Sequence, residues 1–310
     1  MLNEVALTPD VFDGSLYSSQ EACAIHLRYI REPLLSEVLV RNLGKGAWSH
    51  YIADTTIRWH LTGKELFKKL VTQNRLRTFD RAGETDPQND DQWCHEAIAS
   101  SQIENLEVIL STDSIAASHK ECALVHPVEK ATSSKWWQGR SPSRIVQRNV
   151  EEYLCVLKLV LSSANSLIFV DPHIDPSQPR YSNFIRLLLA AKRNPPATLE
   201  VHRCCYEGSG QSRQIFTGAR RAELEGRFRE NWRTPLEQAG IKVSVFVWPD
   251  LHDRALISNL IGMDVSNGFD ESNDISQTVR FLRLGRDDSE KVQRDVDPAV
   301  NKPLYVFQIP

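Results

Sequence analysis

The sequence predicts an α/β protein whose second half is a mixed, largely parallel sheet flanked by helices. Three apolar runs, at residues 166–171, 198–205 and 241–248, have the character of buried strands. Helical patterns separate these runs, so the strands are expected to be joined by right-handed crossovers. The length of 310 residues indicates about two domains. We place them at residues 1–134 and 135–310.

The first of these regions, residues 1–134, is predicted to be mostly helical. Apolar residues recur every three or four positions from about residue 19 to residue 70, with Pro33 as an interruption. The polar, acidic stretch 80–93 is predicted to be a loop, and residues 106–112 a strand. No motif here indicates a function. We expect this region to position substrate or protein partners.

The second region is predicted element by element. An amphipathic helix at residues 146–163 precedes the strand that ends at Asp171. A proline-rich connection leads to a helix at residues 183–193, then to the second strand and to an arginine-rich helix that ends at Gly240, a natural C-cap. After the third strand, shorter strands near residues 255–266, 278–285 and 303–309 are expected to pair antiparallel at one side of the sheet.

Composition excludes several classes of protein. The formal net charge is -3, so a polyanionic partner must be bound by a local basic patch. No stretch of ~18 uncharged apolar residues is present, so no membrane span is expected. The six cysteines have no CxxC spacing, and the acidic N-terminus differs from a signal peptide, so we expect a cytoplasmic location. No motif calls for a metal or another cofactor, and we expect none.

His252 and Arg254 are the most informative pair. On an extended chain, side chains two positions apart project to the same face. A histidine nitrogen can attack phosphorus or transfer a proton, and a guanidinium can hold two phosphoryl oxygens at once. The segment HDRALISN, followed by a short hairpin and SNGFD, therefore predicts a phosphate site.

These residues resemble the HxKxxxxD motif and downstream small polar segment of the phospholipase D superfamily, and the order of elements over residues 151–307 is similar to that fold. The resemblance implies a phospholipase D-like domain with His252 as the covalent nucleophile and Arg254 in place of the lysine. It also implies that Asn267, Ser266 and Asn259 line the phosphate site. HDR further resembles a variant found in the C-terminal domain of MIT-domain proteins, which binds phosphate without the catalytic histidine pair.

The family's reaction uses two histidines, and this chain has one such motif. A homodimer would bring two copies of His252 together across a two-fold axis. We therefore expect a metal-independent phosphodiesterase, more specifically a nuclease, that forms a phosphohistidine intermediate in a homodimer. The alternative is a catalytically inactive module that binds phosphate or nucleic acid in a larger complex.

Two further groups are candidates for contacts with substrate. Asp171 and His173 follow a strand's C-terminal end, where α/β sheets gather their ligands. They are expected at the rim of the same cleft; the alternatives are a metal site, or a proline-fixed turn in which Asp171 accepts backbone N–H bonds. Arg220 and Arg221 belong to an arginine cluster at residues 213–233, which fits either nucleic-acid contact or a solvated helix face.

Overall fold

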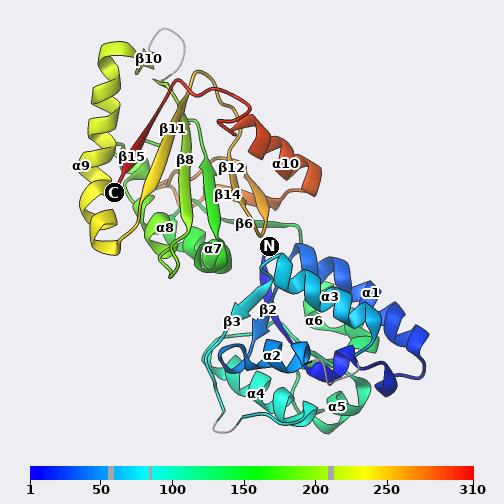
Figure 1. Ribbon diagram of the computed structural model, residues 1–310. Helices are drawn as coiled ribbons and strands as arrows, with labels where there is room; N and C mark the ends of the chain where they lie inside the picture. The colour runs from blue at the N-terminus through cyan, green and yellow to red at the C-terminus, as the bar shows by residue number, and fades with distance from the viewer. Residues whose placement is uncertain (55–58, 84–85, 209–212) are drawn as a thin grey trace. The chain divides into compact units, whose positions relative to one another are not determined.

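The computed structural model describes residues 1–54, 59–83, 86–208 and 213–310 (Figure 1). The chain divides into two compact units. The N-terminal unit is Leu2–Arg140, and the C-terminal unit is Ser141–Pro310 together with Met1. The short helix α6 (Lys135–Gly139) therefore belongs to the first unit, where Trp136 is part of the hydrophobic core.

The N-terminal unit is built on a five-stranded parallel sheet in the order β3-β2-β1-β4-β5. Its strands are β1 (Asn3–Leu7), β2 (Val38–Asn42), β3 (Leu76–Thr78), β4 (Ile109–Ser111) and β5 (Val125–Pro127). The helices of this unit besides α6 are α1 (Gln20–Ser36), α2 (Ala47–Ala53), α3 (Leu61–Thr72), α4 (Asp90–Ile103) and α5 (Asp113–Ser118). The central strands are buried along both faces, as expected of a parallel sheet between helices.

The prediction of a mostly helical N-terminal region was therefore incomplete, because it missed the sheet apart from β4. Val38 was assigned to a helical pattern, yet it begins β2, whose five residues are all buried. A short apolar run buried on both faces has no period of two, so it resembles a buried helix segment in sequence. The stretch 80–93, predicted to be a loop, also contains the start of α4 at Asp90. Residues 84–85 of that stretch lie outside the described residues.

The C-terminal unit contains an eight-stranded sheet in the order β15-β11-β8-β7-β12-β13-β14-β6 (Figure 1). Its strands are β6 (Ser143–Gln147), β7 (Ser166–Val170), β8 (Thr198–Cys204), β11 (Val243–Trp248), β12 (Ala255–Ser258), β13 (Gly262–Val265), β14 (Thr278–Arg283) and β15 (Tyr305–Ile309). A separate small hairpin pairs β9 (Tyr206–Glu207) with β10 (Gln214–Ile215). The helices are α7 (Val150–Ser163), α8 (Ile185–Ala190), α9 (Arg221–Ala239) and α10 (Arg286–Asp295).

The C-terminal sheet is mixed, as expected, but it is not largely parallel. Within the described residues, β7, β8 and β11 pair parallel, and the remaining neighbours in this sheet pair antiparallel. The predicted helix–strand alternation is present, with Gly240 ending α9 in the left-handed conformation at φ 69°. The later strands are antiparallel, as predicted, but they do not lie at one side of the sheet: β12, β13 and β14 extend it beside β7, while β15 returns to the opposite edge beside β11. The edge of the sheet that each strand joins depends on contacts between distant parts of the chain, which local periodicity does not encode.

His202 lies inside β8 and is fully buried. Its Nδ1 accepts a hydrogen bond from Trp248 Nε1 at 3.0 Å, and its Nε2 lies 3.1 Å from Glu200 Oε2. Burial lowers the pKa of His202 below its usual value, although Glu200 acts in the opposite direction. The folded protein therefore holds this ring in its neutral form more strongly than the unfolded chain does.

We expect the C-terminal unit to lose stability as pH falls below about 6.5, because the unfolded chain then binds a proton that folded His202 resists. In His202→Gln, which keeps a donor and an acceptor but does not titrate, this loss should be smaller. Urea unfolding midpoints between about pH 7.5 and 5.5 measure the effect. The exposed-histidine variant His252→Gln serves as the control. Equal pH dependence in wild type and His202→Gln would contradict this assignment.

Candidate phosphate site

The candidate site lies where β7 ends and β12 begins. These strands are antiparallel neighbours, with Ala255 opposite Val170. Arg254 directly precedes β12 and Asp171 directly follows β7, so the ladder places the two residues side by side. The segment from Leu251 to Arg254 forms neither helix nor strand.

Asp171 is the buried centre of this site, with no exposed surface. Its carboxylate accepts hydrogen bonds from the backbone N–H groups of His173 (3.0 Å) and Phe269 (2.9 Å) and from the hydroxyl of Tyr181 (3.1 Å). Burial raises the pKa of Asp171, while these donors and the charge of Arg254 oppose that rise. Asp171 thus joins the end of β7 to the SNGFD segment.

The SNGFD segment connects β13 to β14 and lies against both Asp171 and Arg254. Gly268 has φ +80°, and a Cβ there would lie 2.1 Å from Asp171 Oδ2 and 3.2 Å from Arg254 Cδ. Any larger residue at this position would collide with a buried carboxylate and strain the backbone. The segment predicted from sequence to accompany the motif is therefore in contact with it.

Ser266 and Asn267 have exposed side chains that hold this connection together. Ser266 Oγ accepts a hydrogen bond from the N–H of Arg280 at 3.0 Å, and Asn267 Nδ2 donates to the carbonyl of Thr278 at 3.0 Å. Their predicted contact with phosphate remains a prediction. In the structure, both side chains hydrogen-bond to the backbone of β14 and so stabilise the conformation of this loop.

Arg254 is partly buried, and its guanidinium makes no hydrogen bond or ion pair with any residue that the structure describes, whereas its backbone carbonyl accepts a hydrogen bond from the N–H of Val265 at 2.8 Å. Its charge acts on neighbouring groups nonetheless. The pKa of His173 is lowered first by burial and also by Arg254, with Asp171 acting in the opposite direction. Asp171, His173 and Arg254 therefore belong to one electrostatic neighbourhood, and the guanidinium is available to an anion.

His252 lies two residues before Arg254, in the segment that forms neither helix nor strand. Its side chain is 83% exposed, and Nε2 lies 3.2 Å from Asp250 Oδ2. No aliphatic wall encloses the ring, so another molecule can approach it.

Asn259 does not belong to the site. Its Oδ1 accepts hydrogen bonds from the N–H groups of Asn165 (2.7 Å) and Ser166 (3.3 Å), at the start of β7. Asp171 follows the other end of that strand, and five residues at about 3.3 Å each span roughly 16 Å. The predicted substrate role of Asn259 is therefore wrong, because its side chain caps the opposite end of the strand.

Two arginines of the cluster pair with glutamates at the start of α9. Arg220, the N-cap residue, pairs with Glu223 at 3.0 Å, and Arg221, the first residue of the helix, pairs with Glu225 at 2.7 Å. Neither makes a hydrogen bond, ion pair or ring contact with Asp171, His173 or Arg254 among the described residues. Their predicted contact with nucleic acid stays a prediction: both side chains are partly exposed, and in the structure each one pairs with a glutamate one turn away.

No protein-family model matches this chain, and no curated protein matches it in sequence. Among solved structures, the chain is similar to one described as the structure of TrmBL2, an archaeal chromatin protein that shows a novel mode of DNA binding. The TM-score is 0.31 and the sequence identity is 8%, over 80% of this chain and 83% of that chain. A similarity of this size does not establish a shared fold or function. None of the described helices is long and apolar enough to cross a membrane.

The N-terminal unit has features that sequence reasoning missed, at the carboxyl ends of its parallel strands. Asp10 follows β1 and is fully buried; its Oδ2 accepts a hydrogen bond from the N–H of Thr112, after the neighbouring strand β4. Burial and the charges of Asp10 and Asp13 raise the pKa of Asp90 to about 6. Such strand ends are where open α/β sheets bind ligands, and the missed strands explain why the sequence did not indicate this cluster.

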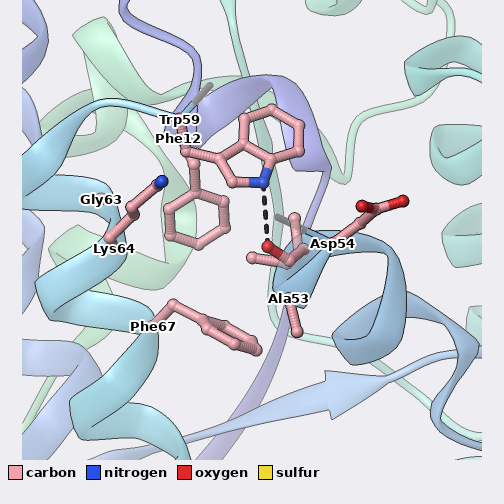
Figure 2. A pocket seen from close by; sticks show the side chains of 8 residues that line it. Phe12, Ala53, Asp54, Trp59, Gly63, Lys64 and Phe67 are labelled. Atoms are coloured by element: carbon pink, nitrogen blue, oxygen red, sulfur yellow. Dashed lines mark hydrogen bonds between the residues drawn. The ribbon is translucent and has the colours of Figure 1, made fainter. Parts of the chain in front are cut away.

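A pocket of about 200 Å³ opens near these strand ends in the N-terminal unit. Figure 2 shows the rings of Phe12, Trp59 and Phe67 around it. Trp59 Nε1 donates to the carbonyl of Ile52 at 2.9 Å, which fixes the indole against α2. The described lining also includes Lys64 and Asp54, so the pocket combines aromatic walls with two charged side chains.

Proposed function

We propose that the C-terminal unit is a phospholipase D-like domain and that its Arg254 edge binds the phosphodiester groups of nucleic acid. The observation that carries this proposal is the partly buried Arg254 guanidinium, which has no ion-pair or hydrogen-bond partner among the described residues. Arginines on α9 are paired with glutamates, whereas Arg254 keeps its planar donors free for an anion.

The resemblance to phospholipase D enzymes supports a specific reaction at this edge. A nitrogen of His252 attacks phosphorus, a P–N bond forms, and the P–O bond to the leaving group breaks. His252 of the partner subunit gives its proton to the departing oxygen. Water then cleaves the P–N bond, losing a proton to that same second imidazole, and Arg254 stabilises the charge on the phosphoryl oxygens.

The exposure of His252 favours a second candidate function. Catalytic side chains are normally held in place by neighbouring groups, but His252 is 83% exposed and its one ion pair among described residues is with Asp250. A phosphate-binding module without hydrolytic activity requires Arg254 and does not require a positioned nucleophile. The two functions therefore share one binding site and differ at His252.

We expect Arg254→Ala to weaken binding of a fluorescent single-stranded DNA or RNA oligonucleotide by about 10- to 100-fold, because a charge-assisted hydrogen-bonded contact is worth roughly 1.5–3 kcal/mol. Fluorescence anisotropy at fixed salt concentration measures the effect. Arg286→Ala, which removes an exposed arginine from α10, is the matched control and should bind like wild type. Equal affinity in Arg254→Ala and wild type would refute the phosphate site.

Cleavage assays on the same protein samples distinguish a phosphodiesterase from a phosphate-binding module without activity. Cleavage of DNA or RNA that persists in EDTA and is lost in His252→Ala, by a protein of dimeric mass, supports the phosphodiesterase. Binding that depends on Arg254 without cleavage supports the module. Hydrolysis of phospholipid vesicles instead of nucleic acid would redirect the substrate assignment to lipid.

A further inference from the structure

A cluster of two imidazoles and one carboxylate lies on the N-terminal unit, outside the sites described above. Asp91 and His95 come from α4, and His119 is the C-cap residue of α5. His119 Nε2 lies 2.8 Å from Asp91 Oδ1, and His95 Nε2 lies 3.6 Å from Asp91 Oδ2. One potential ligand atom from each of the three residues falls within 4.8 Å of the others.

The local backbone holds these side chains in place. Asp91 and His95 are four residues apart on a helix, so both project from one face of α4. The side chain of Asn89 caps this helix by accepting from the N–H of Gln92, at the turn that carries Asp91. His119 is fixed at the end of α5, where its N–H donates to the carbonyl of Ile115 and its carbonyl accepts from the N–H of Cys122.

A hydrogen bond to Asp91 accounts for the position of His119 but not for that of His95. His119 is 8% exposed, and a buried imidazole is expected to find a carboxylate partner. His95 is 67% exposed and has water available, yet its Nε2 faces the same carboxylate. The two rings contact each other edge to face, with centroids 4.6 Å apart. Both imidazoles thus direct Nε2 toward the carboxylate of Asp91, one toward each oxygen.

We propose that Asp91, His95 and His119 bind a divalent transition-metal ion of the Zn²⁺ class. Two imidazole nitrogens and a carboxylate oxygen are a donor set that suits zinc. Tetrahedral zinc with ligands at about 2.0–2.1 Å places them roughly 3.3–3.4 Å apart. The two separations above run to different oxygens of Asp91. Because one ligand atom from each residue lies within 4.8 Å of the others, side-chain adjustments of up to about 1.5 Å would bring all three to this spacing. Because His95 is exposed, water can reach the ion and occupy a further coordination position.

This inference goes beyond the proposed function and is independent of it, because its residues belong to the other unit. The ion would clamp the first turns of α4 to the end of α5. Asp91 and His119 are 28 residues apart in sequence, so the clamp closes a loop in the chain and should stabilise the N-terminal unit.

The test is equilibrium dialysis of the untagged 310-residue protein against Zn²⁺, followed by metal analysis, with Co²⁺ as a spectroscopic probe of the geometry. Wild type should bind one Zn²⁺ per chain, and Co²⁺ should give the visible absorption of a tetrahedral site. His95→Ala should bind at least about 10- to 100-fold more weakly, since loss of a ligand exceeds the effect of losing an outer-shell partner. His95 is exposed, so this variant is expected to fold.

His126→Ala removes a histidine of β5 in the same unit and should bind like wild type. Zn²⁺ should also raise the thermal unfolding midpoint of wild type and of His126→Ala, but not that of His95→Ala or His119→Ala. Absence of bound Zn²⁺ in wild type would overturn the proposal. Undiminished binding in the double variant His95→Ala, His119→Ala would also overturn it.

Discussion

Asp171→Ala is expected to destabilise the C-terminal unit by about 3–5 kcal/mol. The substitution leaves three buried donors, the N–H groups of His173 and Phe269 and the hydroxyl of Tyr181, without their acceptor. Each unpaired buried donor costs about 1–3 kcal/mol, with incomplete additivity. The raised pKa of Asp171 indicates that the ionised carboxylate is itself costly to bury, so part of this loss is recovered. Urea denaturation followed by circular dichroism measures the change.

Asp171→Asn is the matched control because it keeps the shape of the side chain. Its amide oxygen can still accept from Phe269 and Tyr181, while its amide nitrogen cannot accept from His173. We therefore expect the asparagine variant to lose distinctly less stability than the alanine variant. Equal losses would show that shape and packing, and not the three hydrogen bonds, make Asp171 important.

The second large effect is expected in the N-terminal unit, where Arg41→Ala should cost about 3–5 kcal/mol of stability. Arg41 is fully buried on β2, and its guanidinium binds Glu4 of β1 at 2.8 Å. It also donates to the carbonyls of Ser100 and Glu104, both at 2.9 Å, and lies 4.2 Å from the centre of the Phe79 ring. Removing it leaves a buried carboxylate with one fewer cation and two carbonyls without this donor.

Arg28→Ala is the control, since Arg28 is an exposed residue of α1 and its loss should not shift the unfolding midpoint. Arg41→Lys keeps the charge but lacks the fork that reaches Glu4 and the carbonyls together, so it should recover only part of the stability. Tryptophan fluorescence during urea unfolding reports the change, because Trp48 and Trp93 are buried in the core of this unit. A midpoint shift no larger than that of Arg28→Ala would argue against this role for Arg41.

Local sequence signals were sufficient for most of the C-terminal unit. Helix α7 begins after the N-cap Asn149 and ends at Ser163, the end that its apolar pattern predicts. The strands β7, β8 and β11 coincide with the three apolar runs. Strand β6 and helix α10 were missed: β6 is mostly exposed, and α10 buries none of its residues, so neither has the apolar pattern that the prediction used.

The candidate phosphate site was foreseen only in part. The motif located Arg254 and the SNGFD segment. The prediction that His252 and Arg254 project from one face of a strand is not supported, because β12 begins at Ala255, after both residues. Asn259 was included because it follows Arg254 by five residues, but β12 carries it to the far end of β7. The sequence did not indicate that position 268 requires glycine. A larger residue there would collide with the carboxylate of Asp171, which is 97 residues away in sequence.

The sequence by itself determined where most helices and strands form, because caps, apolar periodicity and turn residues act between neighbours in the chain. Only the tertiary structure decided the order of the strands in the C-terminal sheet, the N-terminal sheet, and the meeting of Asp171, Gly268 and Arg254 or of Asp91, His95 and His119. These features depend on contacts between residues that lie tens of positions apart in the chain. Such contacts form when apolar surfaces and polar groups from distant segments are buried together, and they produce no periodic pattern in the sequence.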